Sequence, residues 1–239
     1  MLDQFIKDKA DLISYNQTEL SNIATTLSNL KDIINNDPDY RAPFLGGSYK
    51  RGTMVKGVSD VDVYFHYTGS GNPQSALDKL KKCLTLSYPT SEIRQDKPSI
   101  LAEFKKIPIN ITPYKKDNWE RLSIPDKYLL NWEQINFGEL ETAITALRQK
   151  NPKYIDLIKI LKLWNFNYKR GIKNFEIERS IVNIYLYNNP NSQSIFDWIW
   201  TFIHNTGCIT DSNRFYTLKS YSNNTALQKS EWLKFIDNK

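Results

Sequence analysis

The chain has 239 residues, of which 40% are hydrophobic and 24% charged, and its 32 basic and 26 acidic residues give a net charge of +6. This composition is typical of a folded globular protein and excludes a largely disordered chain. A net charge of this size suits a partner that carries phosphates, although alone it is usually a solubility feature.

Neither the cysteines nor the amino terminus indicates an extracellular or membrane protein. Cys83 and Cys208 lie far apart in the sequence and match no zinc-binding spacing. The first residues, MLDQFIKDKADL, mix charged with apolar side chains, so we expect no signal peptide and no membrane segment. A reduced, cytoplasmic setting is therefore expected.

Apolar residues recur at helical spacing over residues 2–35, which predicts one helix or two consecutive helices. Thr18 is expected to cap the second part. Beyond Pro38 the period changes. The new pattern predicts strands at residues 42–47 and 58–67, followed by a helix at residues 73–84. It also predicts a β-hairpin whose strands are residues 99–104 and 107–112.

From about residue 118 the strand signal disappears and helical periodicity replaces it. Helices are expected at residues 138–149, 153–168, 175–187 and 193–205. The middle two carry many aliphatic side chains and are expected to form a helical core. The sequence therefore predicts an α+β fold of two domains, residues 1–117 and 118–239.

The segment Gly46–Phe65, GGSYKRGTMVKGVSDVDVYF, is the most informative about chemistry. Successive side chains of a strand point to opposite faces, so Asp60 and Asp62 are expected on the same face. Two close carboxylates repel each other unless a positive charge lies between them. Mg²⁺ or Mn²⁺, hard cations that prefer oxygen ligands, would suit this pair.

A Gly-Gly-Ser turn precedes the two carboxylates in the sequence. Because glycine has no Cβ, the backbone at Gly46 and Gly47 can approach a phosphate closely, and the Ser48 hydroxyl adds a donor. A short helix beginning at Ser48 would also direct free N–H groups at the anion. A phosphate-binding turn beside metal-binding carboxylates is the arrangement that nucleotidyl transfer requires.

Gly47-Ser48, Thr53 and Asp60-Val61-Asp62 together resemble the signature of the DNA polymerase β-like nucleotidyltransferase superfamily. The resemblance is greatest to the branch of the oligoadenylate synthases, the bacterial cGAS/DncV-like nucleotidyltransferases (CD-NTases) and the archaeal CCA-adding enzymes. It implies a palm with a bracing N-terminal helix, a helical C-terminal lobe, and a nucleotide between palm and lobe. It also implies that Asp60 and Asp62 hold two Mg²⁺ or Mn²⁺ ions, and that Gly47 and Ser48 bind the β- and γ-phosphates.

The family is similar in carrying a third carboxylate on a neighbouring strand, where it binds the metal and deprotonates the attacking hydroxyl. The corresponding position here is Asn110, in the stretch INITP. An amide can offer an oxygen to a metal ion but cannot act as a base at neutral pH. Three explanations stay open: an engineered Asp-to-Asn change, a natural substitution in a weak enzyme or nucleotide-binding relic, or a register in which Glu103 serves instead. We favour the first, because the other two carboxylates and the glycine turn are intact.

The helical lobe offers two further candidates. Lys162, in IDLIKILKLW, looks like the family's lysine that reaches the triphosphate, although a solvated lysine on an amphipathic helix explains it equally well. Asn174 occupies the place where relatives have a phosphate-contacting serine, and its amide can still donate. Tyr114, Trp164 and Tyr168 could stack on a base, but core packing explains each of them better.

These features predict attack of a hydroxyl on the α-phosphate of an NTP or dNTP, with release of pyrophosphate. The expected product is a short or cyclic oligonucleotide signal of bacterial anti-phage defence, with an effector protein from the same operon as partner. In a variant of this reading, a protein hydroxyl such as that of Tyr216 or Tyr221 starts the oligomer. The alternatives are nucleotide addition to an RNA 3′ end, which calls for a larger basic surface, and a nucleotide-binding pseudoenzyme, suggested by Asn110.

Overall fold

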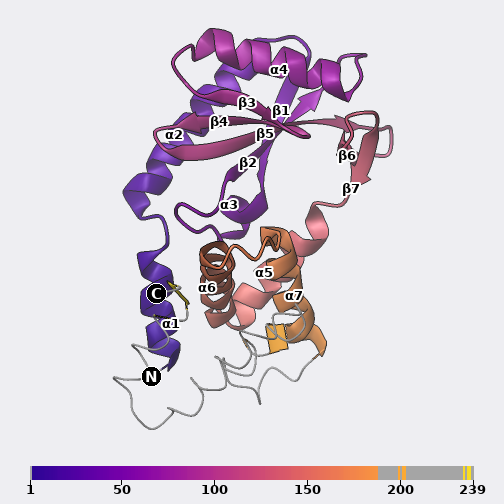
Figure 1. Ribbon diagram of the computed structural model, residues 1–239. Helices are drawn as coiled ribbons and strands as arrows, with labels where there is room; N and C mark the ends of the chain where they lie inside the picture. The colour runs from indigo at the N-terminus through magenta and orange to yellow at the C-terminus, as the bar shows by residue number, and fades with distance from the viewer. Residues whose placement is uncertain (1, 188–198, 200, 203–233, 235, 238–239) are drawn as a thin grey trace. The chain divides into compact units, whose positions relative to one another are not determined.

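The computed structural model describes residues 2–187, 199, 201–202, 234 and 236–237. They form a mixed α+β fold, as the sequence predicts (Figure 1). The fold divides into two compact units that alternate along the chain. The sheet unit comprises Tyr15–Lys50 and Ser59–Glu139, and the helical unit comprises Met1–Ser14, Arg51–Val58 and Leu140–Lys239.

The N-terminal helical stretch is two helices, α1 (Leu2–Leu12) and α2 (Gln17–Asn35). Asn16 caps α2: its Oδ1 accepts from the Glu19 N–H at 2.9 Å, and Glu19 Oε2 accepts from the Asn16 N–H at 2.8 Å. This reciprocal pair is a capping box, which satisfies two backbone donors that have no partner inside the helix. The prediction that Thr18 is the N-cap was therefore wrong.

The sheet unit is built on a mixed seven-stranded sheet. Its strands are β1 (Tyr40–Gly46), β2 (Val61–Tyr67), β3 (Ile93–Asp96), β4 (Ser99–Phe104), β5 (Ile107–Lys116), β6 (Leu122–Pro125) and β7 (Trp132–Ile135). The main order is β1-β2-β5-β4-β3, in which only the β2–β5 pair is parallel. The hairpin of β4 and β5 confirms the prediction, and both turn residues, Lys105 and Lys106, have positive φ, as a tight two-residue hairpin turn requires.

Three strands were not predicted. β3, β6 and β7 have four residues each, too few to show a clear alternation of apolar and polar side chains. β6 pairs with the end of β5 and with β7, so the prediction that strands end near residue 118 was wrong.

The two faces of the sheet differ in character. Val61, Val63 and Phe65 of β2 are buried, and α2 and α4 (Pro73–Ser87) pack against strands of the sheet. Figure 1 shows α4 above the sheet. The alternate residues of β2, beginning with Asp62, are only half-buried and point to the other face. The chemically interesting side chains thus lie on the face opposite to the apolar one.

The helical unit contains the short helices of the C-terminal half. α5 (Gly138–Lys150), α6 (Lys153–Asn167) and α7 (Asn174–Tyr187) confirm three predicted helices. α1 and α7 both pack on α6, whose side chains supply much of the core. Of the fourth predicted helix, residues 193–205, the structure describes Ile199, Thr201 and Phe202, which are helical, whereas the other residues of this stretch and the tyrosines Tyr216 and Tyr221 lie outside the described residues.

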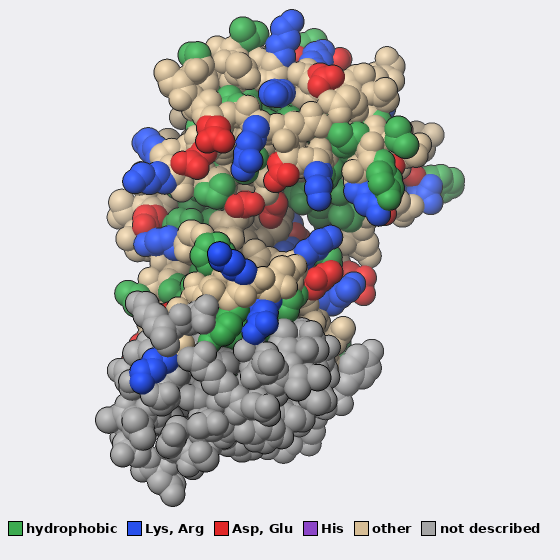
Figure 2. Space-filling view, viewed as in Figure 1, with side chains coloured by type: hydrophobic (Ala, Val, Ile, Leu, Met, Phe, Trp, Pro, Cys, Tyr) green, Lys and Arg blue, Asp and Glu red, His purple; other side chains and the backbone are tan. Residues whose placement is uncertain are grey.

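Side chains of both signs share the described surface. On the face shown in Figure 2, lysine and arginine side chains are interspersed with acidic ones. None of the described helices has both the length and the apolar character needed to cross a membrane.

Candidate active site

The carboxylate pair lies at the start of β2. Asp60 immediately precedes the strand and Asp62 is its second residue, with the buried Val61 between them. In the sheet, Asp62 pairs with Gly46 of β1 on one side and with Asn110 of β5 on the other. The sheet therefore brings together the glycine turn, the carboxylates and the third predicted position, all within one unit.

The glycine turn is shaped by Asp62. Gly47 has φ +61°, and a Cβ there would lie 2.6 Å from Cγ and 2.9 Å from Cβ of Asp62, closer than real atoms approach. A side chain at Gly47 would thus need both a strained backbone and a displaced carboxylate. Ser48, the next residue of the short helix α3 (Gly47–Arg51), is buried.

Asn110, and not Glu103, lies next to the carboxylates. Its Nδ2 donates to Oδ2 of Asp60 at 2.9 Å. Glu103 pairs with Pro108 in the β4–β5 ladder, and its side chain is exposed. The observed register thus argues against the explanation in which Glu103 replaces the missing carboxylate.

The surroundings of Asp60 disfavour its ionised form. Burial raises the pKa of Asp60 above its usual range; the hydrogen bond from Asn110 opposes this shift, and the negative charge of Asp96 adds to it. Asp96 lies at the end of β3 and was not considered from the sequence. A carboxylate with a raised pKa is stabilised by a proton, or by a bound cation.

The oxygen atoms of this site suit a hard cation. Among the described residues, no group of three or more His, Cys, Asp or Glu side chains is arranged to hold a metal ion. The third position carries an amide instead, and two carboxylates with one amide oxygen are still ligands that Mg²⁺ and Mn²⁺ accept. Asp60, Asp62 and Asn110 therefore fit such an ion, with one negative ligand charge fewer than three carboxylates.

Lys162 has partners within the helical unit. Its side chain is fully buried, and Nζ donates to Oε1 of Glu178 at 2.7 Å, to the backbone O of Thr53 at 3.0 Å and to Thr53 Oγ1 at 3.2 Å. Arg51 makes a second ion pair with Glu178, at 2.7 Å, and the Thr53 hydroxyl also donates to Glu178. The predicted contact of Lys162 with a triphosphate stays a prediction.

Glu178 is a residue that the sequence analysis missed. Burial alone would raise its pKa, but the charges of Lys162 and Arg51 and the hydrogen bonds of this cluster outweigh burial, so the pKa of Glu178 is lowered. The available signal was its position on α7, since it follows Ile177 and precedes Ile181 within the buried stripe of that helix. An acidic residue inside such a stripe needs a buried cationic partner.

Asn174, the other candidate of the helical unit, and a second lysine of α6 can also be located. Asn174, the first residue of α7, is half-buried, and its phosphate contact stays a prediction. Lys159, one turn before Lys162, donates to the Ser14 hydroxyl at 2.9 Å. Burial lowers the pKa of Lys159, and the nearby Arg148 contributes to this shift.

The aromatic candidates pack inside the protein. Tyr114 is buried, donates to the backbone O of Ala42 at 3.1 Å, and has its ring 5.0 Å from that of Phe44. Trp164 is buried in the helical core, next to the ring of Tyr168. Core packing is thus confirmed for Tyr114 and Trp164.

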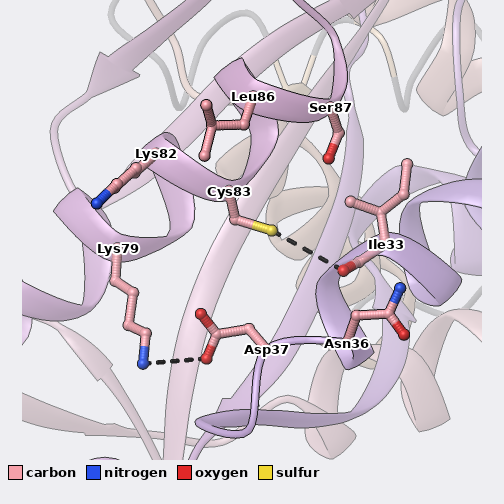
Figure 3. Close-up of a pocket in the computed structure, with 8 residues that line it drawn as sticks. All are labelled: Ile33, Asn36, Asp37, Lys79, Lys82, Cys83, Leu86 and Ser87. Atoms are coloured by element: carbon pink, nitrogen blue, oxygen red, sulfur yellow. Dashed lines mark hydrogen bonds and ion pairs between the residues drawn. The ribbon is translucent and has the colours of Figure 1, made fainter.

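A groove elsewhere in the sheet unit has a volume of about 450 Å³. Figure 3 shows its lining from the end of α2 and from α4: Ile33, Asn36, Asp37, Lys79, Lys82, Cys83, Leu86 and Ser87. Burial and the charge of Asp37 raise the pKa of the Cys83 thiol, which therefore stays protonated at neutral pH. The groove shares no residue with the carboxylate site.

Comparison with known proteins gives consistent results. Residues 1–151 match the family described as Second Messenger Oligonucleotide or Dinucleotide Synthetase domain (SMODS). A probable cyclic nucleotide synthase of Bacillus cereus is 24% identical over 259 residues, which covers 85% of this chain and 78% of that protein. The cyclic AMP-AMP-AMP synthase of Escherichia coli is 25% identical over 204 residues, 77% of this chain and 61% of that protein, so the alignment spans less than two thirds of that relative.

Known structures agree on the fold. The structure of CdnC from E. coli MS115-1 with ATP matches with a TM-score of 0.74 at 13% identity, and the match covers 98% of this chain and 97% of that one. At this identity the likeness shows the fold alone. The family match covers more than half of the chain, and the glycine turn and the Asp-Val-Asp strand lie within the matched residues. The chain therefore belongs to the SMODS family and is a nucleotidyltransferase of the CD-NTase branch of the polymerase β-like superfamily.

Proposed function

We propose that this protein joins nucleoside triphosphates into a short or cyclic oligonucleotide signal. A hydroxyl attacks the α-phosphate of an NTP or dNTP and pyrophosphate leaves. The observation that carries this proposal is the position of Asp62, flanked in the sheet by Gly46 on one side and Asn110 on the other, with Asp60 hydrogen-bonded to Asn110. The names of the two relatives, both cyclic nucleotide synthases, support a cyclic product.

In this proposal each residue of the site has a distinct task. Asp60 and Asp62 hold divalent cations, which when bound neutralise the triphosphate and lower the pKa of the attacking hydroxyl. Gly47 and Ser48 bind the β- and γ-phosphates, and Gly47 does so with a backbone that carries no side chain of its own. Lys162 and Asn174 are proposed as further phosphate contacts, and for Lys162 this requires the ammonium to exchange a bond to Glu178 or Thr53 for one to phosphate.

Asn110 limits the rate in this proposal. Its amide can offer an oxygen to a cation but cannot take the proton of the attacking hydroxyl. We therefore expect the chain as it stands to be a weak enzyme and its Asn110→Asp variant to be an active one. The same residue supports a second candidate function, a pseudoenzyme that binds nucleotides without joining them.

A signal molecule would need a receiver. The family description names second messengers, so we propose that the product acts on an effector protein, in the context of anti-phage defence. Nucleotide addition to an RNA 3′ end is the less favoured alternative, because the face in Figure 2 mixes acidic with basic side chains.

The decisive experiment incubates the wild type and Asn110→Asp with each labelled NTP and dNTP and Mg²⁺, with and without RNA. The proposal expects products from nucleotides alone, at least 100-fold more with Asn110→Asp, since a general base contributes about 10²–10⁴-fold. The matched control is the double variant Asp62→Asn/Asn110→Asp, which should make none. Products that form only with RNA would replace the proposal by end addition. Nucleotide binding without product from either version would leave the pseudoenzyme.

A further inference from the structure

Asn110 lies between a carboxylate and a hydroxyl. Its Nδ2 donates to Oδ2 of Asp60 at 2.9 Å, and its Oδ1 lies 3.5 Å from Oγ of Ser99. Ser99 is buried, and its Oγ is also 3.1 Å from the backbone O of Asp96. All four residues belong to the sheet unit, so both ends of the amide have a polar neighbour within the same compact unit.

The Asn110 amide directs a donor, and not an acceptor, at Asp60. An –NH₂ group only donates, so it stabilises the carboxylate of Asp60 but opposes a cation bound to that carboxylate. A hard cation held by Asp60 and Asp62 calls for an oxygen at this position instead. A half-turn about the Cβ–Cγ bond of Asn110 exchanges its oxygen and nitrogen, two groups of nearly equal size, without moving the strand.

Ser99 is able to serve both orientations. Its hydroxyl has one proton to donate and two lone pairs to accept with. In the observed orientation the proton can go to Oδ1 of Asn110. After the half-turn it can go to the backbone O of Asp96, which leaves a lone pair of Oγ to accept from Nδ2. No buried polar group then loses its partner in either orientation.

We propose that the Asn110 amide is a reversible ligand, with Nδ2 toward Asp60 when the cation is absent and Oδ1 toward the cation when it is bound. The proposal rests on the proposed function, because it takes Asp60 and Asp62 as the cation ligands. Ser99 is then a positioning residue, whose hydroxyl holds the reversed amide. Its role is specific to an amide, since a carboxylate at position 110 has an oxygen on both sides and needs no reversal.

The test measures cation binding directly rather than activity. Free Mn²⁺ is counted by electron paramagnetic resonance during titration of the full chain with MnCl₂ alone. The side-chain ¹⁵N–¹H₂ signal of Asn110, assigned by its loss in Asn110→Asp, is followed during titration with MgCl₂. The variants are Ser99→Ala alone and combined with Asn110→Asp. Ser99→Thr keeps the hydroxyl, whereas Ser99→Val introduces a side chain with the shape of threonine but without the hydroxyl. Thermal unfolding checks that each variant is folded.

The proposal expects Mg²⁺ to shift the Asn110 amide signal and Ser99→Ala to weaken Mn²⁺ binding about tenfold, the lower end of the effect of removing the support of a metal ligand. Ser99→Thr should bind like the wild type and Ser99→Val like Ser99→Ala. With Asp at position 110, loss of the Ser99 hydroxyl should change the affinity less than twofold. Three results would overturn this inference but not the proposed function. Loss of the Ser99 hydroxyl could weaken Mn²⁺ binding equally with Asn and with Asp at position 110, or weaken it with neither. Saturating Mg²⁺ could also leave the Asn110 amide signal unchanged. Absence of Mn²⁺ binding to both wild type and Asn110→Asp would overturn the proposed function with it.

Discussion

The backbone of Gly47 lies directly against the carboxylate of Asp62, so closely that an added β-carbon would overlap the Asp62 side chain. The contact joins residues of the glycine turn and of β2, which are far apart in the sequence but adjacent across the β1–β2 ladder. It fixes where the proposed phosphate-binding turn lies relative to a proposed cation ligand. Glycine at this position therefore has two reasons, its positive φ and the space it leaves for Asp62.

We predict that Gly47→Ala lowers the rate of nucleotide joining about 100-fold, the loss typical of a displacement of about 1 Å in a reacting group. The substitution should also lower the free energy of unfolding by about 1–3 kcal/mol, because alanine is strained at positive φ. Rates are measured in the Asn110→Asp background, and stability by urea unfolding.

Gly57→Ala is the matched control for this prediction. Gly57 also has positive φ, at +73°, but a Cβ there would meet nothing within 4 Å. It should lose the stability that positive φ alone costs, less than Gly47→Ala loses, and keep its activity. If both variants lose activity alike, the contact between Gly47 and Asp62 has no special role.

The buried cluster of Lys162 and Glu178 provides a prediction about stability. Glu178→Gln leaves the Lys162 ammonium buried without an opposite charge, so it should lower the free energy of unfolding by about 3–5 kcal/mol. Lys162→Met should cost less than this, because Arg51 still pairs with Glu178. Lys159→Met is the control on the same helix, because the ammonium of Lys159 is hydrogen-bonded to a hydroxyl, Ser14. We expect it to change stability by less than about 1 kcal/mol. A similar loss for both lysines would contradict a special role for the Glu178 pair.

The same cluster predicts a sensitivity to acid. The pKa of Glu178 is lowered from its ordinary 4.5, so its stabilising effect is fully present above pH 4.5 and is lost as the pH falls through the folded-state pKa. The difference in unfolding free energy between the wild type and Glu178→Gln should therefore shrink from pH 7 to pH 3.5. A difference that stays constant over this range would show that Glu178 is not held ionised by Lys162 and Arg51.

The sequence was most informative where function and local structure use the same pattern. The alternation of side chains along β2 predicted that Asp60 and Asp62 share one face, and the glycines predicted a turn. In the structure these residues of the sheet unit lie together. The position of Asn110 came from the resemblance of the INITP stretch to the family's third-carboxylate strand, and the sheet pairs Asn110 with Asp62.

The residues that support the site were harder to predict, because their partners are distant in the sequence. Glu178 meets Thr53 and Lys162 only after three segments of the chain have packed together. Ser99 contacts Asn110 across the β4–β5 hairpin. Because serine is common in turns, a serine at this position does not by itself predict a contact with the site. Pair contacts of this kind depend on tertiary structure, which a pattern of apolar residues does not encode.

At the start of α2, one hydrogen bond decides which of two residues is the N-cap. Thr18 and Asn16 are both good N-cap residues by type, but only Asn16 accepts from the Glu19 N–H, at 2.9 Å. Asn16→Ala should therefore lower the free energy of unfolding by about 1 kcal/mol. Thr18→Ala, an exposed position inside the helix, should be neutral or slightly stabilising, because alanine has the higher helix propensity. Urea unfolding of both variants decides between the two caps, and a larger loss for Thr18→Ala would show that the helix begins later than the structure indicates.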